Sequence, residues 1–299
     1  MIKKDIDYIA VIALCTAMLV WASSFIALKS AIGPIGPMTV IFGRMFIASL
    51  CFLYFIKRFL RLKFTKDDIK YLALMVLFEP CLYFIFEANA LSYTTAGQAG
   101  MITSTMPIMT AIGAGIFLKE IISKKFILGS LVAICGVIWL SLSASSSESA
   151  SNPLLGNSLQ FMAMICAAGY AISIRYLVKK FSPLFLTAIQ AFVGAIFFLP
   201  FAAWEYNTIV MDFNPEALLW VVYLGVVVTL GGYGLFNFAL SRIQASKASM
   251  FINLIPVFTL ILAFLILGER LGIFEMFASM VILLGVAITQ VPFRKKRAK

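Results

Sequence analysis

The stretch ALSYTTAGQAGMITSTMPIMTAIGAGIFLKE at residues 90–120 is followed 149 residues later by a second version of itself, ALSRIQASKASMFINLIPVFTLILAFLILGE at residues 239–269. The two stretches align without a gap. Leucine and alanine matches alone would arise by chance between two apolar sequences, but proline, glutamate and methionine also return in register. This agreement indicates an internal repeat. The matched pairs include Met101 with Met250, Pro107 with Pro256, Glu120 with Glu269 and, beyond the stretch, Gly136 with Gly285.

The repeat continues towards the N-terminus at a slightly different offset of 146 residues. Residues 21–29, WASSFIALK, align with residues 167–175, AAGYAISIR, and Pro37 aligns with Pro183. The change in offset falls around the loop between the second and third apolar segments. Each copy contains five apolar segments, and an odd number of crossings requires the two copies to enter a membrane in opposite orientations.

Apolar residues dominate the composition. Of the 299 residues, 62% are hydrophobic and only 12% are charged, and the mean hydropathy is +1.01. A soluble domain of this size needs more polar residues to cover its surface. A membrane span needs about 20 apolar residues, and ten windows qualify: 8–28, 37–57, 69–91, 96–118, 125–143, 157–177, 184–204, 217–239, 248–267 and 273–291. We therefore predict an all-α membrane protein with ten transmembrane helices arranged as two inverted five-helix repeats.

The predicted organisation has four parts. The first repeat covers residues 1–143 and the second covers residues 157–293. A polar, serine-rich linker at 144–156 joins them, and residues 294–299 form a basic tail. The first apolar run is too long for a signal peptide and lacks a clear cleavage site, so we interpret it as a retained first span.

The positive charge is unevenly distributed. The formal net charge is +11, but no basic stripe alternates with stacking aromatic residues, as a nucleic-acid groove requires. The basic residues gather in the loops after the second, fourth, sixth and eighth spans and at both termini, whereas the opposite side keeps only Lys29 and Arg270. Because cytoplasmic loops carry an excess of Lys and Arg, we predict a multi-pass protein of the bacterial inner membrane with both termini in the cytoplasm.

Several kinds of chemistry find no support in the sequence. The chain has no histidine, and its five cysteines lie in apolar runs without a CxxC pair. No GxxxxGK[ST] motif for nucleotide binding is present. We therefore expect no catalysis, no metal and no cofactor. The expected partners are the lipid bilayer and a small-molecule substrate, without nucleic acid, and the sequence leaves open whether the protein is a monomer or a homodimer.

One segment of the second copy carries a family resemblance. Residues 246–271, SKASMFINLIPVFTLILAFLILGERL, closely resemble the EamA domain of the drug/metabolite transporter superfamily. Residues 99–107 and 117–120 of the first copy do so too, and the opening WASSF at 21–25 is typical of the family. The resemblance covers essentially the whole chain and is specific for the family but weak for substrate. It implies ten helices in two inverted repeats around a central substrate cavity. Members look like secondary carriers, many of them exporters of amino acids and related metabolites.

Two acidic residues lie inside the third span. Glu79 and Glu87 are eight residues apart with Tyr83 midway, so all three fall on one stripe of a helix. An ionised side chain at mid-membrane costs about 2.5–3.5 kcal/mol on insertion scales, so each carboxyl needs a reason to be there. Pro80 frees a backbone carbonyl and kinks the helix beside Glu79. A role in proton coupling or substrate binding is one interpretation, and a structural pair with Arg44 or a backbone group is the other.

Arg44 lies in the outer half of the second span, and its partner in the repeat is Gln190. Three roles fit this position. The guanidinium binds a substrate carboxylate bidentately, it pairs with Glu79 or Glu87, or it extends along the helix towards the membrane surface. The sequence alone does not choose among these roles.

Aromatic and polar residues elsewhere are candidates for lining a substrate cavity. Trp21 lies in the first span and Tyr170 in its repeat mate, and both also suit helix packing or contact with lipid. Pro107 and Pro256 interrupt the fourth and ninth spans at matching positions, and such symmetric breaks point to the binding region of a transporter. A tolerated kink without ligand contact is the alternative. Two further polar candidates are Asn237 and Asn253.

Charged residues near the span ends have simpler interpretations. Lys29 and Arg175 end equivalent spans and suit interfacial anchors, with a gating role as the alternative. Glu120 and Glu269 each precede a helix, where the helix dipole favours a carboxylate. We therefore expect each of these glutamates to stabilise the helix that follows it.

These features together predict a secondary active transporter that exports a small metabolite, such as an amino acid or a related compound, by alternating access. Proton coupling is an open option. An integral membrane enzyme is a competing hypothesis, against which stands the lack of a nucleophile–base pair. A non-transporting membrane protein is the third. The sequence leaves the substrate, the direction of transport, the coupling ion and the oligomeric state open.

Overall fold

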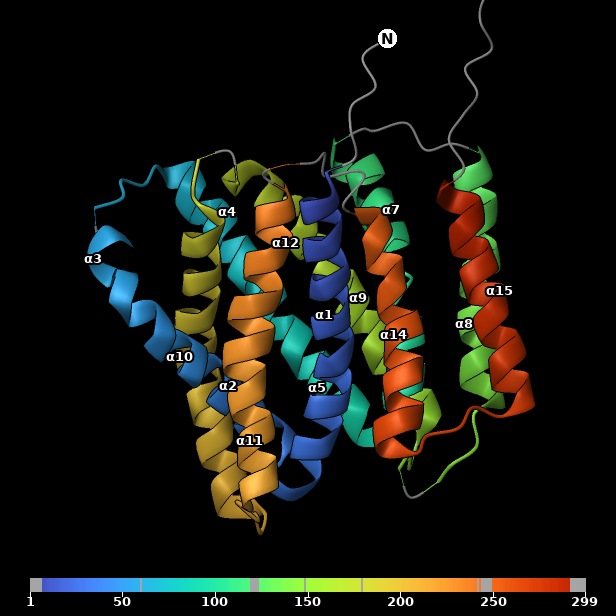
Figure 1. Ribbon diagram of the computed structural model, residues 1–299. Coiled ribbons are helices and arrows are strands. Elements are labelled where there is room, and N and C mark those ends of the chain that lie inside the picture. Colours follow the sequence, from blue (N-terminus) through green and yellow to red (C-terminus); the bar gives the residue numbers. More distant parts are fainter. Residues whose placement is uncertain are drawn as a thin grey trace, which may run out of the picture.

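The computed structural model describes residues 7–59, 61–118, 124–147, 149–178, 180–240, 242 and 249–290, and their regular structure is helical (Figure 1). The predicted basic tail at 294–299 lies outside the described residues. In chain order the elements are α1 (Tyr8–Ile35), α2 (Pro37–Phe52), η1 (Leu53–Phe55), α3 (Ile56–Phe59), α4 (Lys66–Val76), η2 (Leu77–Leu82), α5 (Tyr83–Tyr93), α6 (Ala96–Thr103), α7 (Met106–Leu118), α8 (Lys124–Ser143), α9 (Pro153–Leu177), α10 (Pro183–Thr208), α11 (Pro215–Tyr223), η3 (Leu224–Gly232), α12 (Tyr233–Leu240), η4 (Ser249–Asn253), α14 (Leu254–Leu262), η5 (Ala263–Leu267) and α15 (Ile273–Gln290).

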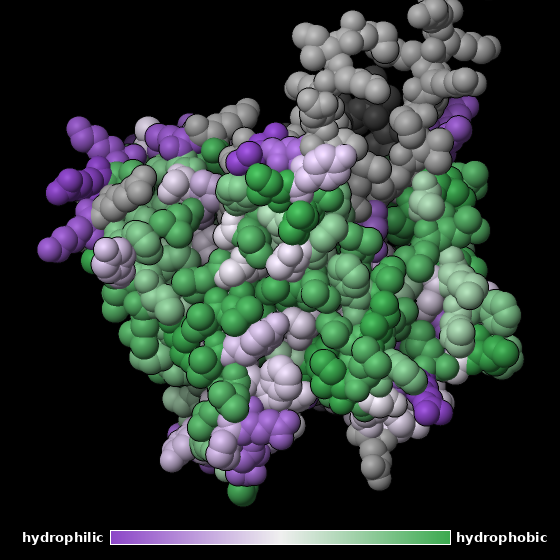
Figure 2. Space-filling model, in the orientation of Figure 1, coloured by the Kyte–Doolittle hydropathy of each residue, from purple (hydrophilic) through white to green (hydrophobic). Residues whose placement is uncertain are grey.

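The surface of the helical bundle is that of a membrane protein. Figure 2 shows apolar residues across the middle of the molecule and polar residues gathered at both ends. Large apolar side chains point outward, as at Leu219 and Leu265, each 69% exposed. An apolar surface of this extent is stable only in lipid. Seven helical segments in the described part of the chain are long and apolar enough to cross a bilayer: Tyr8–Ile35, Pro37–Phe55, Lys66–Tyr93, Lys124–Ser143, Pro153–Ile174, Pro183–Thr208 and Pro215–Phe236.

Shorter apolar helices occupy the rest of the predicted spans. The predicted span at 96–118 is divided between α6 and α7, and the one at 248–267 is divided among η4, α14 and η5. Leu254–Leu267 and Ile273–Thr289 are apolar but shorter than the seven long segments. These helices therefore lie within the predicted apolar windows, and the two windows that contain Pro107 and Pro256 are interrupted.

Helix starts recur along the chain with the offsets found in the sequence. α2 begins at Pro37 and α10 at Pro183, 146 residues later. α4 begins at Lys66 and α11 at Pro215, 149 residues later, and the starts of α8 and α15 differ by the same 149. Each of these prolines occupies the first turn of its helix, where the missing N–H has no helical partner to lose. The structure thus repeats where the sequence repeats.

Irregular backbone also recurs at matching positions. The π-helical segments η2 and η3 each interrupt a long helix. The break between α6 and α7 falls at Ser104 and Thr105, and the junction of η4 and α14 falls at Asn253, 149 residues after Ser104. Pro107 and Pro256 stand in the first turn of the helix after each break, where proline is tolerated. The two prolines therefore begin new helices after interruptions at matching positions, which is where the sequence places the breaks.

Helices that are equivalent in the repeat pack against each other. α2 lies along α10, and α8 lies along α15 (Figure 1). The second pair comes very close, because a Cβ added to Gly285 would lie 2.3 Å from the Ala133 nitrogen, and one added to Gly129 would lie 2.6 Å from the Gly285 oxygen. Small residues allow this approach of two backbones in a membrane, where packing rather than water exclusion holds helices together.

The central helix is α1, which packs against α11, η3, α12, α14, α2 and α5. Its face in the bundle is fully buried at Leu14, Met18 and Ile26 and at small residues such as Ala17 and Ala22. Leu14 belongs to a small cluster with Ala239 of α12, and the other four belong to a core shared with α2, α5 and α14. Residues of both halves of the chain thus meet on α1.

The two ends of the bundle differ. We call the end at which α1 begins and α15 ends the basic end, because the loop between α3 and α4, which carries the exposed Arg61 and Lys63, lies there too (Figure 1). The other end carries Gly36 between α1 and α2, the residues after α8 and the turn at Gly268, and we call it the linker end.

Two ion pairs join helices of the two halves. The Lys180 ammonium pairs with the Asp68 carboxylate, which also completes the capping box of α4. The Arg242 Nε lies 2.8 Å from the Asp7 carboxylate.

Candidate functional site

The long helix formed by α4, η2 and α5 is broken at its centre. Glu79 has an extended backbone (φ −146°, ψ 115°) within an otherwise helical run, and its peptide bond to Pro80 is cis. At this break the Gln190 amide of α10 donates to the Glu79 carbonyl over 3.1 Å. Gln190 is the residue that the repeat pairs with Arg44. A side chain of the second half therefore completes the backbone of the first.

The Glu79 side chain points into the interior. It is 7% exposed, and its carboxylate accepts a hydrogen bond from the hydroxyl of Tyr233 in α12. One turn further along α5, the hydroxyl of Tyr83 donates to the Glu87 carboxylate over 2.5 Å, and Glu87 is 4% exposed. The predicted stripe of Glu79, Tyr83 and Glu87 therefore lies inside the protein, with a phenol on each carboxylate.

Arg44 supplies the positive charge at the same place. It is 4% exposed, so it does not extend to the membrane surface. Its Nε donates to the Thr229 hydroxyl over 3.2 Å, and the guanidinium stands 4.5 Å from the centre of the Phe84 ring. Among the described residues, no carboxylate oxygen lies within 4.0 Å of the guanidinium, although Glu79 and Glu87 are close enough to interact with it electrostatically.

These groups surround a small internal cavity. Its volume is about 10 Å³, which is room for about one water molecule. A site for a small-molecule ligand usually measures several hundred Å³, so the cavity is too small to hold an organic molecule in this conformation. Its lining residues come from α2, η2, α5, α10, η3 and α12: Arg44, Met45, Glu79, Pro80, Phe84, Thr187, Gln190, Ala191, Thr229 and Tyr233.

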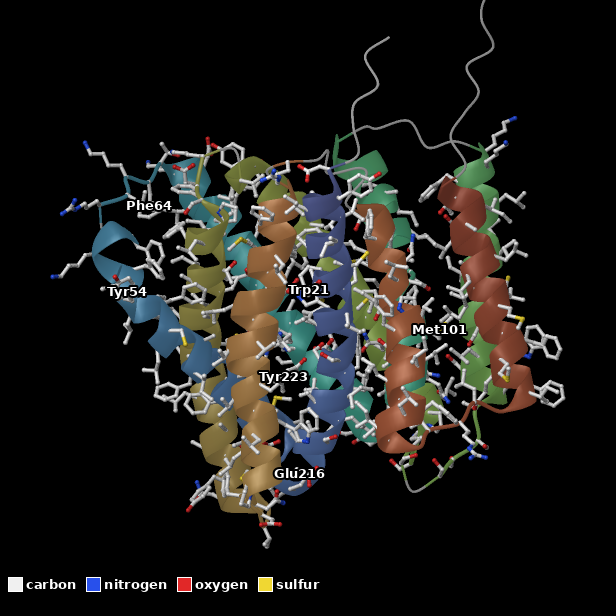
Figure 3. All side chains as sticks on the ribbon, viewed as in Figure 1. Trp21, Tyr54, Phe64, Met101, Glu216 and Tyr223 are labelled. Atoms are coloured by element: carbon white, nitrogen blue, oxygen red, sulfur yellow. The ribbon has the colours of Figure 1, made fainter. Side chains whose placement is uncertain are left out.

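The two predicted aromatic residues lie next to this cavity rather than on its wall. Trp21 sits near the middle of the bundle, beside α11 and α12 (Figure 3). Its ring packs edge-on against Tyr233, 5.2 Å away, and against Phe236, 5.1 Å away. Tyr170 is partly buried against the core formed by α2, α4 and α10. Trp21 thus supports the tyrosine that holds Glu79.

The remaining predicted residues do not reach the cavity. Pro107 and Pro256 are absent from its lining. Asn253 stands at the start of α14, and its side-chain oxygen is buried without a hydrogen-bond partner among the described residues. Asn237 lies in α12, but its side chain is outside the part that the structure describes. The breaks before Pro107 and Pro256 therefore recur symmetrically without lining this central cavity, unlike the break at Glu79 and Pro80.

Several cavity residues were not predicted. Thr229 accepts the hydrogen bond from Arg44, and the Phe84 ring lies against the Arg44 guanidinium. The sequence indicates Gln190 only as the repeat partner of Arg44. Thr229 is the one hydroxyl residue in the run LGVVVTLGG of η3, which is a signal that the sequence offered. Phe84 gave none, since phenylalanine is common in spans. Within the described residues, no cluster of three or more His, Cys, Asp or Glu side chains is placed to hold a metal ion.

The linker end is closed by a lysine. The Lys29 ammonium donates to the backbone oxygens of Leu91, Thr94 and Ser149 at 2.6, 2.7 and 2.6 Å. It therefore ties α1 to the end of α5 and to the residues after α8. A simple anchor in the lipid headgroups would leave the ammonium free, so the structure favours the closing role over the anchoring role for this residue.

Two glutamates cap helices that are distant in the sequence. Glu269 accepts from the backbone nitrogens of Ala96 and Gly97, both at 2.9 Å, so it stabilises α6. The expectation that it stabilises the helix after it is wrong, because Glu275 occupies the first turn of α15 and accepts from Gly272 N. Glu205 caps α2 in the same way, accepting from Met38 N and Thr39 N. Glu120 lies outside the described residues.

Comparison with known proteins gives a consistent result. The model of the EamA-like transporter family matches residues 8–142 and again residues 154–291. An uncharacterized transporter from Archaeoglobus fulgidus is 27% identical, over 92% of this chain and 95% of its own length. The uncharacterized transporter YetK from Bacillus subtilis is 29% identical over 97% and 88%, and YcxC from the same organism is 32% identical over 78% and 76%. A solved crystal structure shares the fold, with a TM-score of 0.62, 18% identity, and coverage of 96% of this chain and 98% of that one.

Proposed function

This chain belongs to the EamA-like transporter family, and we propose that it is a secondary active carrier that exports a small metabolite by alternating access. The family and its named relatives support a membrane transporter. We assign the substrate class and the mechanism from the chemistry of the central cavity. The single observation that carries the proposal is a buried arginine that has no paired carboxylate among the described residues and faces a cavity that both halves of the chain enclose.

The proposed topology has ten crossings, in two inverted repeats of five. The recurrence of helix starts and breaks supports two equivalent halves, and an odd number of crossings in each half inverts one of them. The two described ends of the chain lie at the same end of the bundle (Figure 1), as an even total requires. Since Lys and Arg gather at the basic end, we orient this end to the cytoplasm of a bacterial inner membrane.

The proposed mechanism follows from the size of the cavity. A space for about one water cannot hold a metabolite, so the halves have to separate before substrate enters. Lys29 ties the linker end shut, and the ion pairs at Asp7 and Asp68 tie the basic end. In alternating access these two sets of contacts open in turn, and each opening exposes the central groups to one side only.

The proposed substrate is a zwitterion such as an amino acid. The terminal nitrogens of the Arg44 guanidinium make no hydrogen bond in the described structure, and they suit the bidentate binding of a carboxylate. Glu79 and Glu87 supply acceptors for an ammonium group. Phe84 and Tyr233 bring aromatic surface beside the charged groups, and this surface suits a substrate with an apolar side chain.

Proton coupling follows from the charges in the same region. One guanidinium faces two carboxyl groups inside the membrane. With both carboxyls ionised and no substrate bound, the region would carry one net negative charge, which is costly in a medium of low dielectric constant. A bound proton removes that charge, whereas a bound zwitterion adds no net charge and places its ammonium beside Glu79 while its carboxylate occupies Arg44. We propose that the two compete for Glu79, so that substrate release to one side accompanies proton uptake.

Transport in proteoliposomes tests this function. Purified protein is reconstituted, and the flux of a panel of labelled amino acids and related compounds is measured with and without an imposed pH gradient. We expect saturable flux of at least one zwitterionic compound. R44Q, which installs the residue found at the equivalent position 190, should reduce it by at least about tenfold, since a bidentate charged contact is lost.

Matched controls separate a local effect from a general one. Arg61 is exposed at the basic end, so R61Q makes the same chemical change far from the cavity and should leave the flux unchanged. A compound that is consumed in detergent, without a sealed compartment, would favour an enzyme instead. Flux that is the same for R44Q and the unmodified chain would overturn the assigned role of Arg44.

A further inference from the structure

A second, much larger cavity lies away from the central site. Its volume is about 860 Å³, within the usual range for a bound organic molecule. It lies at the linker end between α14 with η5 on one side and the α8–α15 pair on the other, and part of α6 forms its back (Figure 1). No residue of the central cavity lines it, so it needs an explanation of its own.

The lining of this linker-end cavity changes character along its length. Around the turn between η5 and α15 it is polar, with Glu269, Arg270 and Glu275 and the serines that follow α8. Further along α14 and α15 it is apolar, with Leu260, Phe264, Met276, Met280 and Leu283. Methionine side chains adapt to a flexible apolar partner. A ligand with a polar head and an apolar chain fits such a lining.

The charges at the polar end leave one cation available. Both oxygens of Glu269 accept from backbone nitrogens of α6. Those of Glu275 accept from Gln98 Nε2 at 3.2 Å and from Gly272 N at 2.9 Å. Arg270 is exposed, with its guanidinium 5.9 Å from the centre of the Phe264 ring, and it forms no ion pair among the described residues. Among the charged groups of this lining, Arg270 is therefore the one left without a polar partner within the described residues, while the two carboxylates keep their negative charge and are held by neutral N–H donors.

A buried hydroxyl marks the boundary between the polar and apolar parts. Ser279 is 5% exposed, lines the cavity, and its Oγ has no hydrogen-bond partner in the described structure. Other hydroxyls in these helices bond back to their own helix, as Ser130 does to Phe126 O and Ser141 to Val137 O. A buried hydroxyl left unpaired costs about 1–3 kcal/mol. The hydroxyl of Ser279 therefore lacks an acceptor, and a ligand in the cavity would supply one.

We propose that this cavity binds a glycerophospholipid of the leaflet at the linker end. The lipid phosphate lies against the Arg270 guanidinium, and an ester carbonyl accepts the hydrogen bond from Ser279 Oγ. One acyl chain runs between α14 and α15 along Phe264 and Met280. Ser279 lies six positions after Ile273, where α15 begins. With a rise of about 1.5 Å per residue, the hydroxyl is about 9 Å along the helix from its start. That order of phosphate, ester and chain follows the order of groups in the lipid itself.

Native mass spectrometry tests the proposal on the full-length protein in detergent. The delipidated protein is titrated with dioleoyl phosphatidylglycerol, with dioleoylglycerol, which lacks the phosphate, and with glycerol 3-phosphate, which lacks the chains. We expect one tightly bound phospholipid per protein. Dioleoylglycerol should bind at least about fivefold more weakly, and glycerol 3-phosphate should not compete, because neither offers both parts of the ligand.

Two variants connect the binding to the named groups. R270A should weaken phosphatidylglycerol binding at least about fivefold and leave dioleoylglycerol binding unchanged, while S279A should weaken the binding of both. The matched controls are R61A, an exposed arginine at the basic end, and S141A, a serine bonded to its own helix. Equal affinity for all three ligands in the unmodified protein would overturn the proposal without recourse to any variant. So would competition by glycerol 3-phosphate, or phospholipid binding that neither R270A nor S279A changes.

Discussion

The hydroxyl of Tyr233 donates a hydrogen bond to the carboxylate of Glu79, although the two residues are 154 positions apart and belong to different halves of the repeat. Tyr233 begins α12 directly after the irregular segment η3, and Glu79 lies in the equivalent irregular segment η2. Each half thus uses its break to bring one group to the centre. This hydrogen bond joins the two halves of the chain. It would therefore form and break if the halves move relative to each other during alternating access.

We predict that Glu79 and Tyr233 act as a unit. E79Q and Y233F should each impair transport, and the double variant should be little worse than E79Q alone, because each change removes the charge-assisted bond between the phenol and the carboxylate. The coupling free energy in a double-mutant cycle should be about 1–3 kcal/mol. The measurement is the initial rate of flux in proteoliposomes, with E216Q as the control, because Glu216 is exposed at the linker end (Figure 3).

The response to pH distinguishes a coupling role from a structural one. E79Q has no carboxyl to exchange a proton, so its residual flux should not respond to an imposed pH gradient, whereas Y233F should keep a response. If E79Q retained the full response, proton exchange at this residue would be ruled out, whatever its effect on the rate.

We predict that Lys29 holds the linker end closed. K29M removes three hydrogen bonds from the ammonium and leaves the oxygens of Leu91, Thr94 and Ser149 without that donor. The closed form should lose about 2–3 kcal/mol. In a background whose five native cysteines are replaced by alanine, a cysteine introduced at the central residue Thr229 should then react faster with a water-soluble maleimide in K29M, and K63M, at an exposed lysine, should not change the rate. Equal labelling in K29M would show that other contacts close this end.

How far the sequence predicts this fold depends on the kind of feature. The repeat, and with it the placing of the helices, follows from apolar windows and matched prolines such as Pro37 and Pro183. Local patterns determine these features, and the membrane makes the patterns strong. The breaks at Ser104 and Asn253 do not show in hydropathy, since a polar residue costs a span little unless it is charged.

The central site is only half predictable for a similar reason. Glu79, Glu87 and Arg44 stand out because charge is expensive inside a span. Their partners Thr229 and Phe84 are ordinary span residues, and they become significant only when packing brings them to Arg44. The cap that Glu269 forms on α6 was missed because the residues involved are more than 170 positions apart. Contacts of this range depend on the tertiary fold and leave no local signal.

We predict a small dependence of stability on pH from the pair of Asp7 and Arg242. The hydrogen bond from Arg242 holds the pKa of Asp7 below its ordinary value of 3.8. A depressed pKa in the folded state means that the pair stabilises the fold above that ordinary value and that the contribution is lost as the pH falls through the folded pKa. The difference in melting temperature between the unmodified chain and D7N should therefore be constant from about pH 5 to 8. It should shrink towards zero as the pH falls below about 4.

Salt and the reciprocal variant check this assignment. The pair is solvent-exposed, so 1 M salt should reduce the difference between the two proteins. R242Q should show the same loss of pH dependence as D7N, and the double variant should add nothing further. A difference in melting temperature that persisted unchanged below about pH 4 would contradict the pairing.

The final prediction concerns the contact between α8 and α15. G285A places a methyl group 2.3 Å from the Ala133 nitrogen, which is backbone and has no rotamer by which to move aside. Either the helices separate or the backbone distorts, and overpacking of this kind costs about 1–3 kcal/mol. G234A makes the same chemical change in α12, where nothing lies within 4 Å of the new methyl group. There the change should be neutral or slightly stabilising, because alanine favours a helix over glycine by about 1 kcal/mol. Thermal unfolding in detergent compares the two directly. Equal melting temperatures for G285A and G234A would mean that α8 and α15 do not touch through their backbones.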